Sequence, residues 1–211
     1  MNLIFGAGGH SKEIEWLLQE HNKTVRDRIR LDRFVVEDQS PLKVHLGLPS
    51  ITESEVLQLT SPFSAFIAIG LPSAREKVYR KFLMPKIMWP SLVHYSVVYD
   101  MRKDRVRMGE GAIIFPSSTL TTNVQIGKHV HINAACSISH DVLIGDFCTI
   151  SPGVKLAGGV RLAERVFIGI GAVLIENVCV CADAIVGAGS VVVNDIVEPG
   201  TYVGTPAKRI K

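Results

Sequence analysis

The chain has 211 residues, a formal net charge of +3, 47% apolar residues and 20% charged residues. This composition is typical of a globular protein and excludes a disordered one, and the small charge gives no reason to expect a nucleic-acid partner. No apolar run approaches the roughly 20 residues that a membrane-spanning helix needs. The chain reaches Gly6 without a basic leader, so we expect no signal peptide. The four cysteines form no CxxC pair, which predicts neither a zinc site nor a disulfide framework and favours a cytoplasmic location.

The first 92 residues are expected to form a small α/β domain of Rossmann-like type. The pattern predicts strands over residues 1–5, 34–36 and 65–69 and helices over residues 11–21 and 74–83. Glycine turns follow the first and third strands, which is typical of strand–helix–strand units in a parallel sheet. The first turn, Gly6-Ala7-Gly8-Gly9, is followed by Ser11 where a dinucleotide fingerprint has its third glycine. It is therefore weak evidence for NAD.

From about residue 106 the pattern changes to an aliphatic residue at every sixth position. Fifteen consecutive positions follow it: Met108, Ile114, Leu120, Ile126, Ile132, Ile138, Ile144, Ile150, Leu156, Leu162, Ile168, Leu174, Val180, Val186 and Val192. Neither an α-helix nor a hairpin meander repeats at six. We interpret the pattern as a three-sided solenoid of eighteen residues per coil, whose aliphatic residues stack in a continuous core together with Cys136 and Cys148. The expected limits are 1–92 for the α/β domain, 93–105 for a linker, 106–196 for the solenoid and 197–211 for a tail.

Several motifs resemble those of the hexapeptide-repeat sugar acyltransferases. They are Ile126-Gly127, Ile144-Gly145-Asp146, Val186-Gly187-Ala188-Gly189-Ser190-Val191, the N-terminal Phe5-Gly6-Ala7-Gly8-Gly9-His10-Ser11 and the C-terminal Gly204-Thr205-Pro206-Ala207-Lys208. The resemblance covers almost the whole chain. It implies a left-handed parallel β-helix, a homotrimer and an acetyl-CoA-dependent enzyme without a metal. The implied acceptor is a nucleotide-linked amino sugar or sialic acid in bacterial surface-glycan synthesis, such as that of lipopolysaccharide O-antigen.

The resemblance also implies a catalytic histidine, and the matching motif here is Ser139-His140-Asp141. An imidazole titrates near pH 6.5 and can accept the proton of an attacking amine or hydroxyl, while Asp141 orients it and stabilises its charged form. His140 lies outside the inward positions of the hexad, so it should point out of the solenoid. Gly158 follows it by eighteen residues, or one coil, and is expected to donate its N–H to the thioester carbonyl as an oxyanion develops.

Further positions match family residues that bind the two substrates. For the nucleotide-linked acceptor they are Gly8, Gly9, His10, Glu37, Asp38, Gly70, Asn133 and Thr149. For coenzyme A they are Gly158, Gly171, Ala188, Pro206 and Lys208. Anion binding by a glycine turn at the start of a helix is physically natural. The N-terminal glycines, Gly158 and Asn133 could also serve only as turn residues, and Lys208 could belong to a frayed tail.

Thr149 marks a departure from the family, because many relatives carry a second histidine there that contacts a 2-acetamido group. We therefore expect an acceptor without that group, such as a GDP- or dTDP-linked 4-amino-4,6-dideoxy sugar. Three alternatives stay open: O-acetylation of a sialic-acid-like sugar, a metal-binding β-helix that uses His129 and His131, and a non-catalytic sugar-binding scaffold. For the metal site, the coil-related positions Phe147 and Thr149 supply no third histidine.

Overall fold

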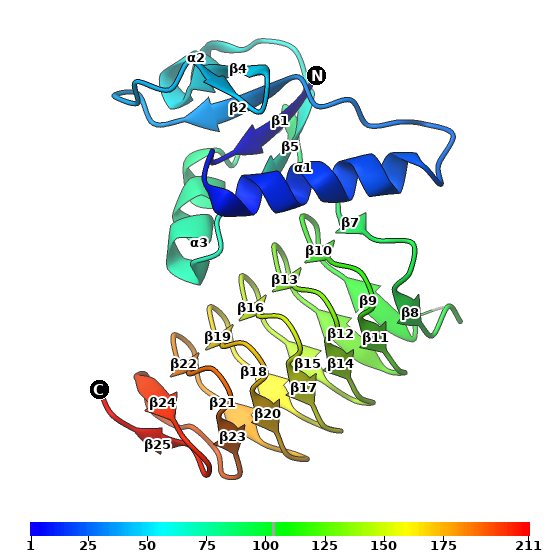
Figure 1. Ribbon diagram of the computed structural model, residues 1–211, viewed down its shortest axis with the longest axis vertical. Helices are drawn as coiled ribbons and strands as arrows, with labels where there is room; N and C mark the ends of the chain where they lie inside the picture. Colours follow the sequence, from blue (N-terminus) through cyan, green and yellow to red (C-terminus); the bar gives the residue numbers. More distant parts are fainter. Residues whose placement is uncertain (103) are drawn as a thin grey trace.

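The computed structural model describes residues 1–102 and 104–211 as an α/β domain seated on one end of a long solenoid (Figure 1). The α/β domain contains, in chain order, β1 (Asn2–Phe5), α1 (Gly9–Asn22), β2 (Arg33–Val36), β3 (Val44–His45), β4 (Leu48–Thr52), α2 (Glu53–Gln58), β5 (Phe63–Ile67), α3 (Pro72–Lys81) and β6 (Ile87–Met88). Its sheet has the order β3-β4-β2-β1-β5-β6 and is parallel except for the β3–β4 hairpin.

Local sequence explains these elements. Three of the four β1 residues are buried, and α1 packs Ile14, Leu17 and Leu18 against the sheet. Pro72 begins α3 at a position where a missing N–H costs no helical hydrogen bond. The predicted strands and helices are confirmed to within two residues at each end. The elements β3, β4, α2 and β6 were not predicted, because each has at most six residues and Pro49 interrupts the pattern of β4.

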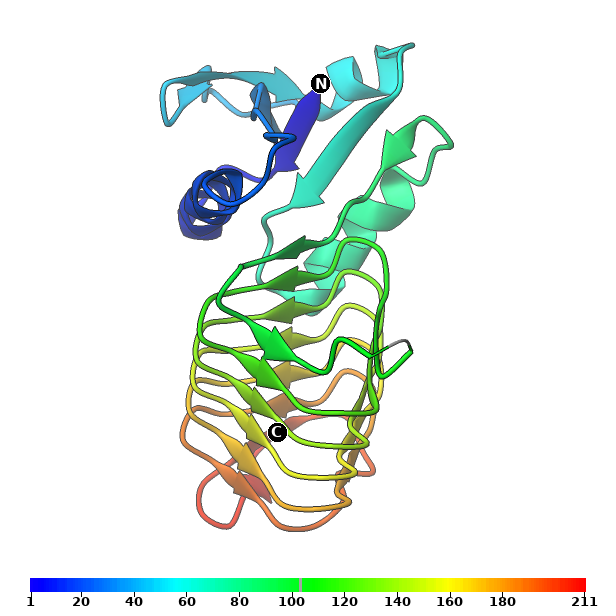
Figure 2. The same ribbon diagram turned by 90° about the vertical axis from the view of Figure 1, so that its right-hand side faces the viewer.

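The solenoid is a parallel β-helix with three faces (Figure 2). The first face consists of β7 (Leu92–Val93), β10 (Ile113–Ile114), β13 (His131–Ile132), β16 (Thr149–Ile150), β19 (Phe167–Ile168), β22 (Ile185–Val186), β24 (Thr201–Val203) and the antiparallel β25 (Lys208–Arg209). The second face consists of β8 (Val98–Tyr99), β11 (Thr119–Leu120), β14 (Ser137–Ile138), β17 (Lys155–Leu156), β20 (Val173–Leu174) and β23 (Val191–Val192). The third face consists of β9 (Val106–Met108), β12 (Val124–Ile126), β15 (Leu143–Ile144), β18 (Arg161–Leu162) and β21 (Cys179–Val180).

The six-residue pattern predicted this core correctly. Paired residues in neighbouring coils are eighteen apart, as in Ile114 and Ile132. Of the fifteen aliphatic positions, fourteen are at most 5% exposed and Met108 is partly buried against the same core. Cys136 and Cys148 are buried in it, as expected.

Strand pairing extends beyond the solenoid limits drawn from the sequence. Strands β7 and β8 already pair with β10 and β11, so residues 92–99 contribute to the first coil. At the other end, β24 and β25 continue the first face into the tail. The division into an α/β domain, a linker, a solenoid and a tail at these residues remains a prediction.

The faces meet at three corners, and these corners position the site. The first corner joins the first and second faces, the second corner joins the second and third faces, and the third corner leads back to the first face of the next coil. His140 lies on the second corner, between β14 and β15.

A buried arginine fixes the α/β domain on the third corner. Arg75 of α3 is fully buried, and its guanidinium donates to the carbonyl oxygens of His129, Phe147 and Cys148 at 2.7–2.9 Å. The same guanidinium donates to Ile69 and Gly70 of its own domain. Burial lowers the pKa of Arg75 to about 9, so the side chain stays charged at neutral pH. No helix in the described part of the chain is long and apolar enough to cross a membrane.

Candidate active site

His140 and Asp141 form a hydrogen-bonded pair on the second corner. The imidazole Nδ1 lies 2.8 Å from Asp141 Oδ2, and the His140 side chain is 64% exposed. Asn123, one coil earlier, donates to the other oxygen of Asp141. The hydrogen bond from Asn123, and then that from His140, hold the pKa of Asp141 below its usual range. An ionised Asp141 makes Nδ1 the protonated nitrogen, which leaves Nε2 able to accept a proton.

Gly158 lies directly beside this imidazole, as the coil spacing predicted. A β-carbon at Gly158 would come within 2.6 Å of His140 Cε1 and Nε2, so only glycine fits without moving the ring. Within the described chain the Gly158 N–H has no hydrogen-bond acceptor. The corner is held in register from its other side, since Gly159 donates to the His140 carbonyl at 2.9 Å. A free N–H next to an exposed imidazole has the geometry expected of an oxyanion donor.

An open cavity of 410 Å³ surrounds this pair. It is lined by His140, Asp141, Gly158, Gly159, Arg161, Glu176 and Asn177. Arg161 and Glu176 were not predicted as site residues, and neither was Asn123. Asn123 lies eighteen residues before Asp141 and Glu176 lies eighteen after Gly158, so counting coils from the predicted catalytic residues would have found both.

A second cavity, of 310 Å³, lies where β1 and β2 end. Ligands of parallel α/β sheets bind at this edge. Gly6 lines it with a φ of +98°, and a β-carbon there would come within 3.1 Å of the Ala68 carbonyl oxygen. Glu37, which was predicted to bind the acceptor, lines the cavity together with Glu53, which was not predicted.

The other predicted residues of the N-terminal turn have different surroundings. Gly8 is the N-cap of α1 and Gly9 its first residue; both are exposed, and no side chain of the described residues caps the helix. Asp38 accepts from the Ser54 N–H and hydroxyl at 2.8 Å and does not line the cavity. Its carboxylate is thus occupied at the start of α2.

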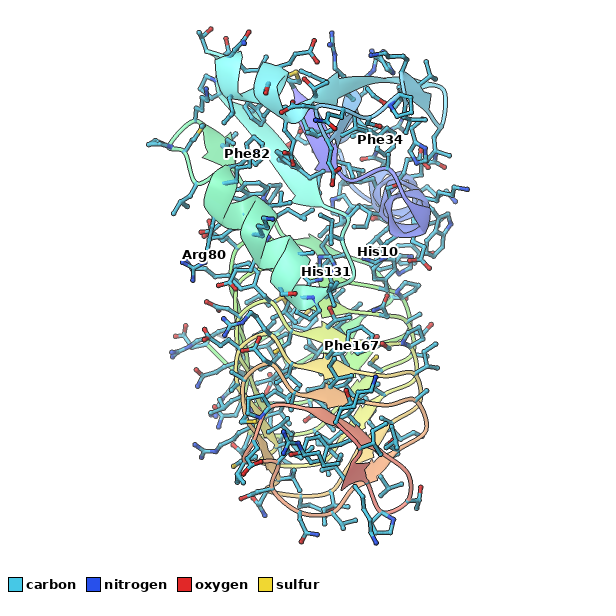
Figure 3. All side chains as sticks on the ribbon, turned by 90° about the vertical axis from the view of Figure 1, so that its left-hand side faces the viewer. His10, Phe34, Arg80, Phe82, His131 and Phe167 are labelled. Carbon is cyan, nitrogen blue, oxygen red and sulfur yellow. The ribbon has the colours of Figure 1, made fainter. Side chains whose placement is uncertain are left out.

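His10 points toward the solenoid (Figure 3). Its Nε2 lies 3.1 Å from Nδ1 of His131, and its Nδ1 lies 2.7 Å from Glu13. The side chain therefore joins the glycine turn to the first face of the solenoid, and its ring nitrogens contact protein groups.

The structure does not bring Gly70, Thr149 or Asn133 to either cavity. Thr149 is 4% exposed, and its hydroxyl donates to the Gly70 carbonyl at 2.7 Å and accepts from Arg75. A sugar bound in this arrangement would not touch Thr149. Asn133 lies on the first corner and donates to the Ile150 carbonyl at 3.0 Å.

The residues predicted for coenzyme A, except Gly158, gather on the first corner. Gly171 and Ala188 are exposed there, in neighbouring coils. Pro206 is exposed as well. It lies beside them because the next residue, Ala207, donates to the Val191 carbonyl at 2.8 Å and so holds this part of the tail against the second face. Lys208 is exposed in β25. In one chain these positions and His140 therefore lie on different corners, at the two edges of the second face.

The buried histidines His129 and His131 are unsuited to a metal. His129 stacks on Phe147, with ring centroids 5.6 Å apart, and burial lowers its pKa to about 3. His131 lies 3.4 Å from a nitrogen of the Arg75 guanidinium, whose positive charge opposes a second cation. Among the described residues no three His, Cys, Asp or Glu side chains are grouped to hold a metal ion.

Comparisons with known proteins agree with this architecture. Residues 3–82 match the model of the PglD N-terminal domain, and residues 123–158 match the bacterial transferase hexapeptide model. No curated protein sequence matches. Among solved structures, GDP-perosamine N-acetyltransferase from Caulobacter crescentus, crystallised with CoA and GDP-perosamine, is 32% identical, with a TM-score of 0.87 over 100% of this chain and 97% of that one.

Two further structures cover nearly the whole chain. WeeI from Acinetobacter baumannii is 27% identical, with a TM-score of 0.87 over 100% of this chain and 99% of that one. The acetyltransferase domain of PglB from Neisseria gonorrhoeae, crystallised with acetyl coenzyme A, is 27% identical, with a TM-score of 0.85 over 99% and 98%. The predicted fold class, a Rossmann-like domain followed by a left-handed parallel β-helix, is confirmed. The chain belongs to the hexapeptide-repeat sugar acetyltransferases and is an acyltransferase of that family.

Proposed function

We propose that this protein transfers an acetyl group from acetyl-CoA to the 4-amino group of a nucleotide-linked 4-amino-4,6-dideoxy sugar, with His140 as general base. The observation that carries the proposal is the placement of the His140–Asp141 pair against the free N–H of Gly158. The similarity to an N-acetyltransferase of GDP-perosamine, a nucleotide-linked amino sugar, supports this class of acceptor.

The residues of the second corner can carry each proton and charge of the reaction. The sugar amine attacks the thioester carbonyl, and His140 Nε2 accepts the proton that the amine loses. The carbonyl oxygen becomes an oxyanion that accepts from the Gly158 N–H, a contact worth about 3 kcal/mol. Collapse of the intermediate breaks the carbon–sulfur bond, and the His140 imidazolium returns the proton to the coenzyme A thiolate. Asp141 stabilises the imidazolium throughout.

The proposal includes a homotrimer whose active sites lie between neighbouring copies. The coenzyme A positions lie on the first corner, His140 on the second, and the α/β domain is docked at the third. Side-by-side packing of solenoids would bring the first corner of one copy to the second corner of the next, and closed symmetry of this kind is common in homo-oligomers.

We further propose that the enzyme works in the bacterial cytoplasm, in the synthesis of a surface glycan such as lipopolysaccharide O-antigen. Four free cysteines are in keeping with a reducing compartment.

The test is release of free thiol from acetyl-CoA against a panel of nucleotide-linked 4-amino sugars, their 2-acetamido analogues and sialic acid. We expect turnover with a 4-amino sugar and a loss of about 10²-fold or more in His140→Ala. His21→Ala, which changes a histidine at the far end of α1, should keep full activity. Turnover of sialic acid alone would favour O-acetylation. Silence across the panel would contradict the proposed acceptor and favour a non-catalytic sugar-binding scaffold.

A further inference from the structure

The cavity where β1 and β2 end continues toward α3. A neighbouring cavity of 350 Å³ shares four lining residues with it, namely Glu37, Glu53, Ile69 and Val78. The combined walls are mostly apolar and include Phe5, Val35 and Leu42. Such walls suit the flat faces of an aromatic ring, and polar groups at the rim would then contact its edge.

A carboxylate and an ammonium lie together at this rim. Glu53, in the first turn of α2, pairs with Lys81, in the last turn of α3, at 2.5 Å. The Glu53 side chain is 18% exposed and that of Lys81 is 44% exposed. The hydrogen bond to Glu53 raises the pKa of Lys81, so the ammonium persists at neutral pH. One group can only accept hydrogen bonds and the other can only donate them.

We infer that the cavity binds guanine, and that the Glu53–Lys81 pair selects a guanosine-diphosphate-linked acceptor. This rests on the proposed function, which leaves the nucleotide open. The edge of guanine presents an acceptor, O6, followed by two donors, N1–H and N2–H. Lys81 donates to O6, while the two oxygens of Glu53 accept from N1–H and N2–H. Such bidentate pairs discriminate between bases more strongly than single contacts do.

The same pair opposes the other bases. Uracil and thymine present acceptor, donor and acceptor, so one Glu53 oxygen would face a carbonyl oxygen across a short distance. Adenine presents a donor followed by an acceptor, which places its donor toward Lys81 and its lone pair toward Glu53. Specificity therefore comes from repulsion of the wrong base as well as from attraction of the right one.

Glu37 completes the arrangement without competing for the base. It follows β2, where acidic residues of Rossmann-like domains accept hydrogen bonds from a ribose hydroxyl. The exposed start of α1 at Gly8 and Gly9 offers backbone N–H groups to a diphosphate. Base, ribose and diphosphate would thus occupy successive parts of one edge of the sheet.

The test measures binding of free nucleotides by calorimetry, without acetyl transfer. We expect GDP to bind about 10- to 100-fold more tightly than ADP, UDP or dTDP. ADP is the informative comparison, because adenine has the same ring size as guanine. Inosine diphosphate lacks the 2-amino group and should bind several-fold more weakly than GDP. Glu53→Gln should remove the preference of GDP over inosine diphosphate. Glu20→Gln is the matched control, because Glu20 has a 17% exposed side chain paired with Lys23 away from the cavity.

Equal affinity for GDP and ADP, or a preference for UDP or dTDP, would overturn the inference. So would unchanged GDP binding in a folded Glu53→Gln variant. These outcomes leave the proposed function intact if a 4-amino sugar on another nucleotide is acetylated. Conversely, selective GDP binding without thiol release from any GDP-linked amino sugar would refute the proposed function and keep the guanine site.

Discussion

Position 158 is where the chemistry depends most directly on the size of one side chain. Gly158→Ala should place a methyl group against His140 Cε1 and Nε2, where only 2.6 Å is available. The imidazole must then turn away from its bond with Asp141. We expect kcat to fall by about 10²-fold with little change in the unfolding midpoint, because His140 is exposed and can move. Steady-state kinetics and denaturant unfolding would measure the two effects.

Gly153→Ala is the matched control on the first corner. Its new methyl group would meet no atom nearer than 4.0 Å, although the φ of +72° makes alanine strained there. We expect a stability loss of about 1 kcal/mol and unchanged kcat. If both variants lost activity equally, general strain in the corners would explain the effect, and Gly158 would have no special part.

The sequence predicted residues on the solenoid better than residues of the α/β domain. The six-residue spacing places His140 outward and Gly158 beside it, because each coil repeats the one before. No such period applies to Arg75, Glu53 or Lys81, whose partners lie in distant elements. Thr149 shows the converse: its match to a family histidine predicted contact with substrate, but α3 covers it.

Among the elements, α3 has the contacts that hold the two halves together. Arg75→Met keeps most of the side-chain volume but removes the donors to the buried carbonyls of His129, Phe147 and Cys148. Buried acceptors without partners are costly, so we expect a loss of about 3 kcal/mol or more in the free energy of unfolding. Denaturant unfolding would measure it, with amide exchange of α3 as a local probe.

Arg80→Ala on the same helix is the control for that variant. Arg80 is 73% exposed and pairs with Glu76 one turn earlier. Exposed pairs of this type contribute about 0.5 kcal/mol, so the effect should be small. A similar small loss in Arg75→Met would show that apolar packing alone docks the domain.

Elements could be predicted from the sequence where a period repeats and not where a single short segment stands alone. The strands of the solenoid have only two or three residues each, yet those between residues 106 and 192 all coincide with a predicted hexad because fifteen repeats reinforce the pattern. The helix α2 has six residues, and its capping box of Thr52 and Glu55 is its main local signal. One capping motif is too weak to predict an element by itself.

At the scale of the whole molecule, a site shared between copies predicts complementation. His140→Ala removes the proposed base, and Ala188→Trp should obstruct the first corner, so each variant alone should be inactive. In trimers mixed at random from equal amounts, about one quarter of the interfaces combine an intact second corner with an intact first corner. We therefore expect about one quarter of the wild-type activity after co-expression.

Light scattering on the same samples would check for a homotrimer. A mixture that stays inactive although mixed trimers form would show that one chain contains a whole site. In that case the first-corner positions would not bind coenzyme A beside a neighbouring His140.

The uniform coil also acts as a ruler between the two halves of the enzyme. Each coil advances the solenoid by one strand spacing, about 4.8 Å. The α/β domain is docked at Arg75 on the coils that carry His129 and Phe147, and His140 lies between these residues in the chain. Loss or gain of a single residue would rotate every later corner, whereas insertion of eighteen residues would keep each side chain in register. Homologous enzymes can therefore vary in length by whole coils beyond Gly158 while the span from the α/β domain to His140 stays fixed.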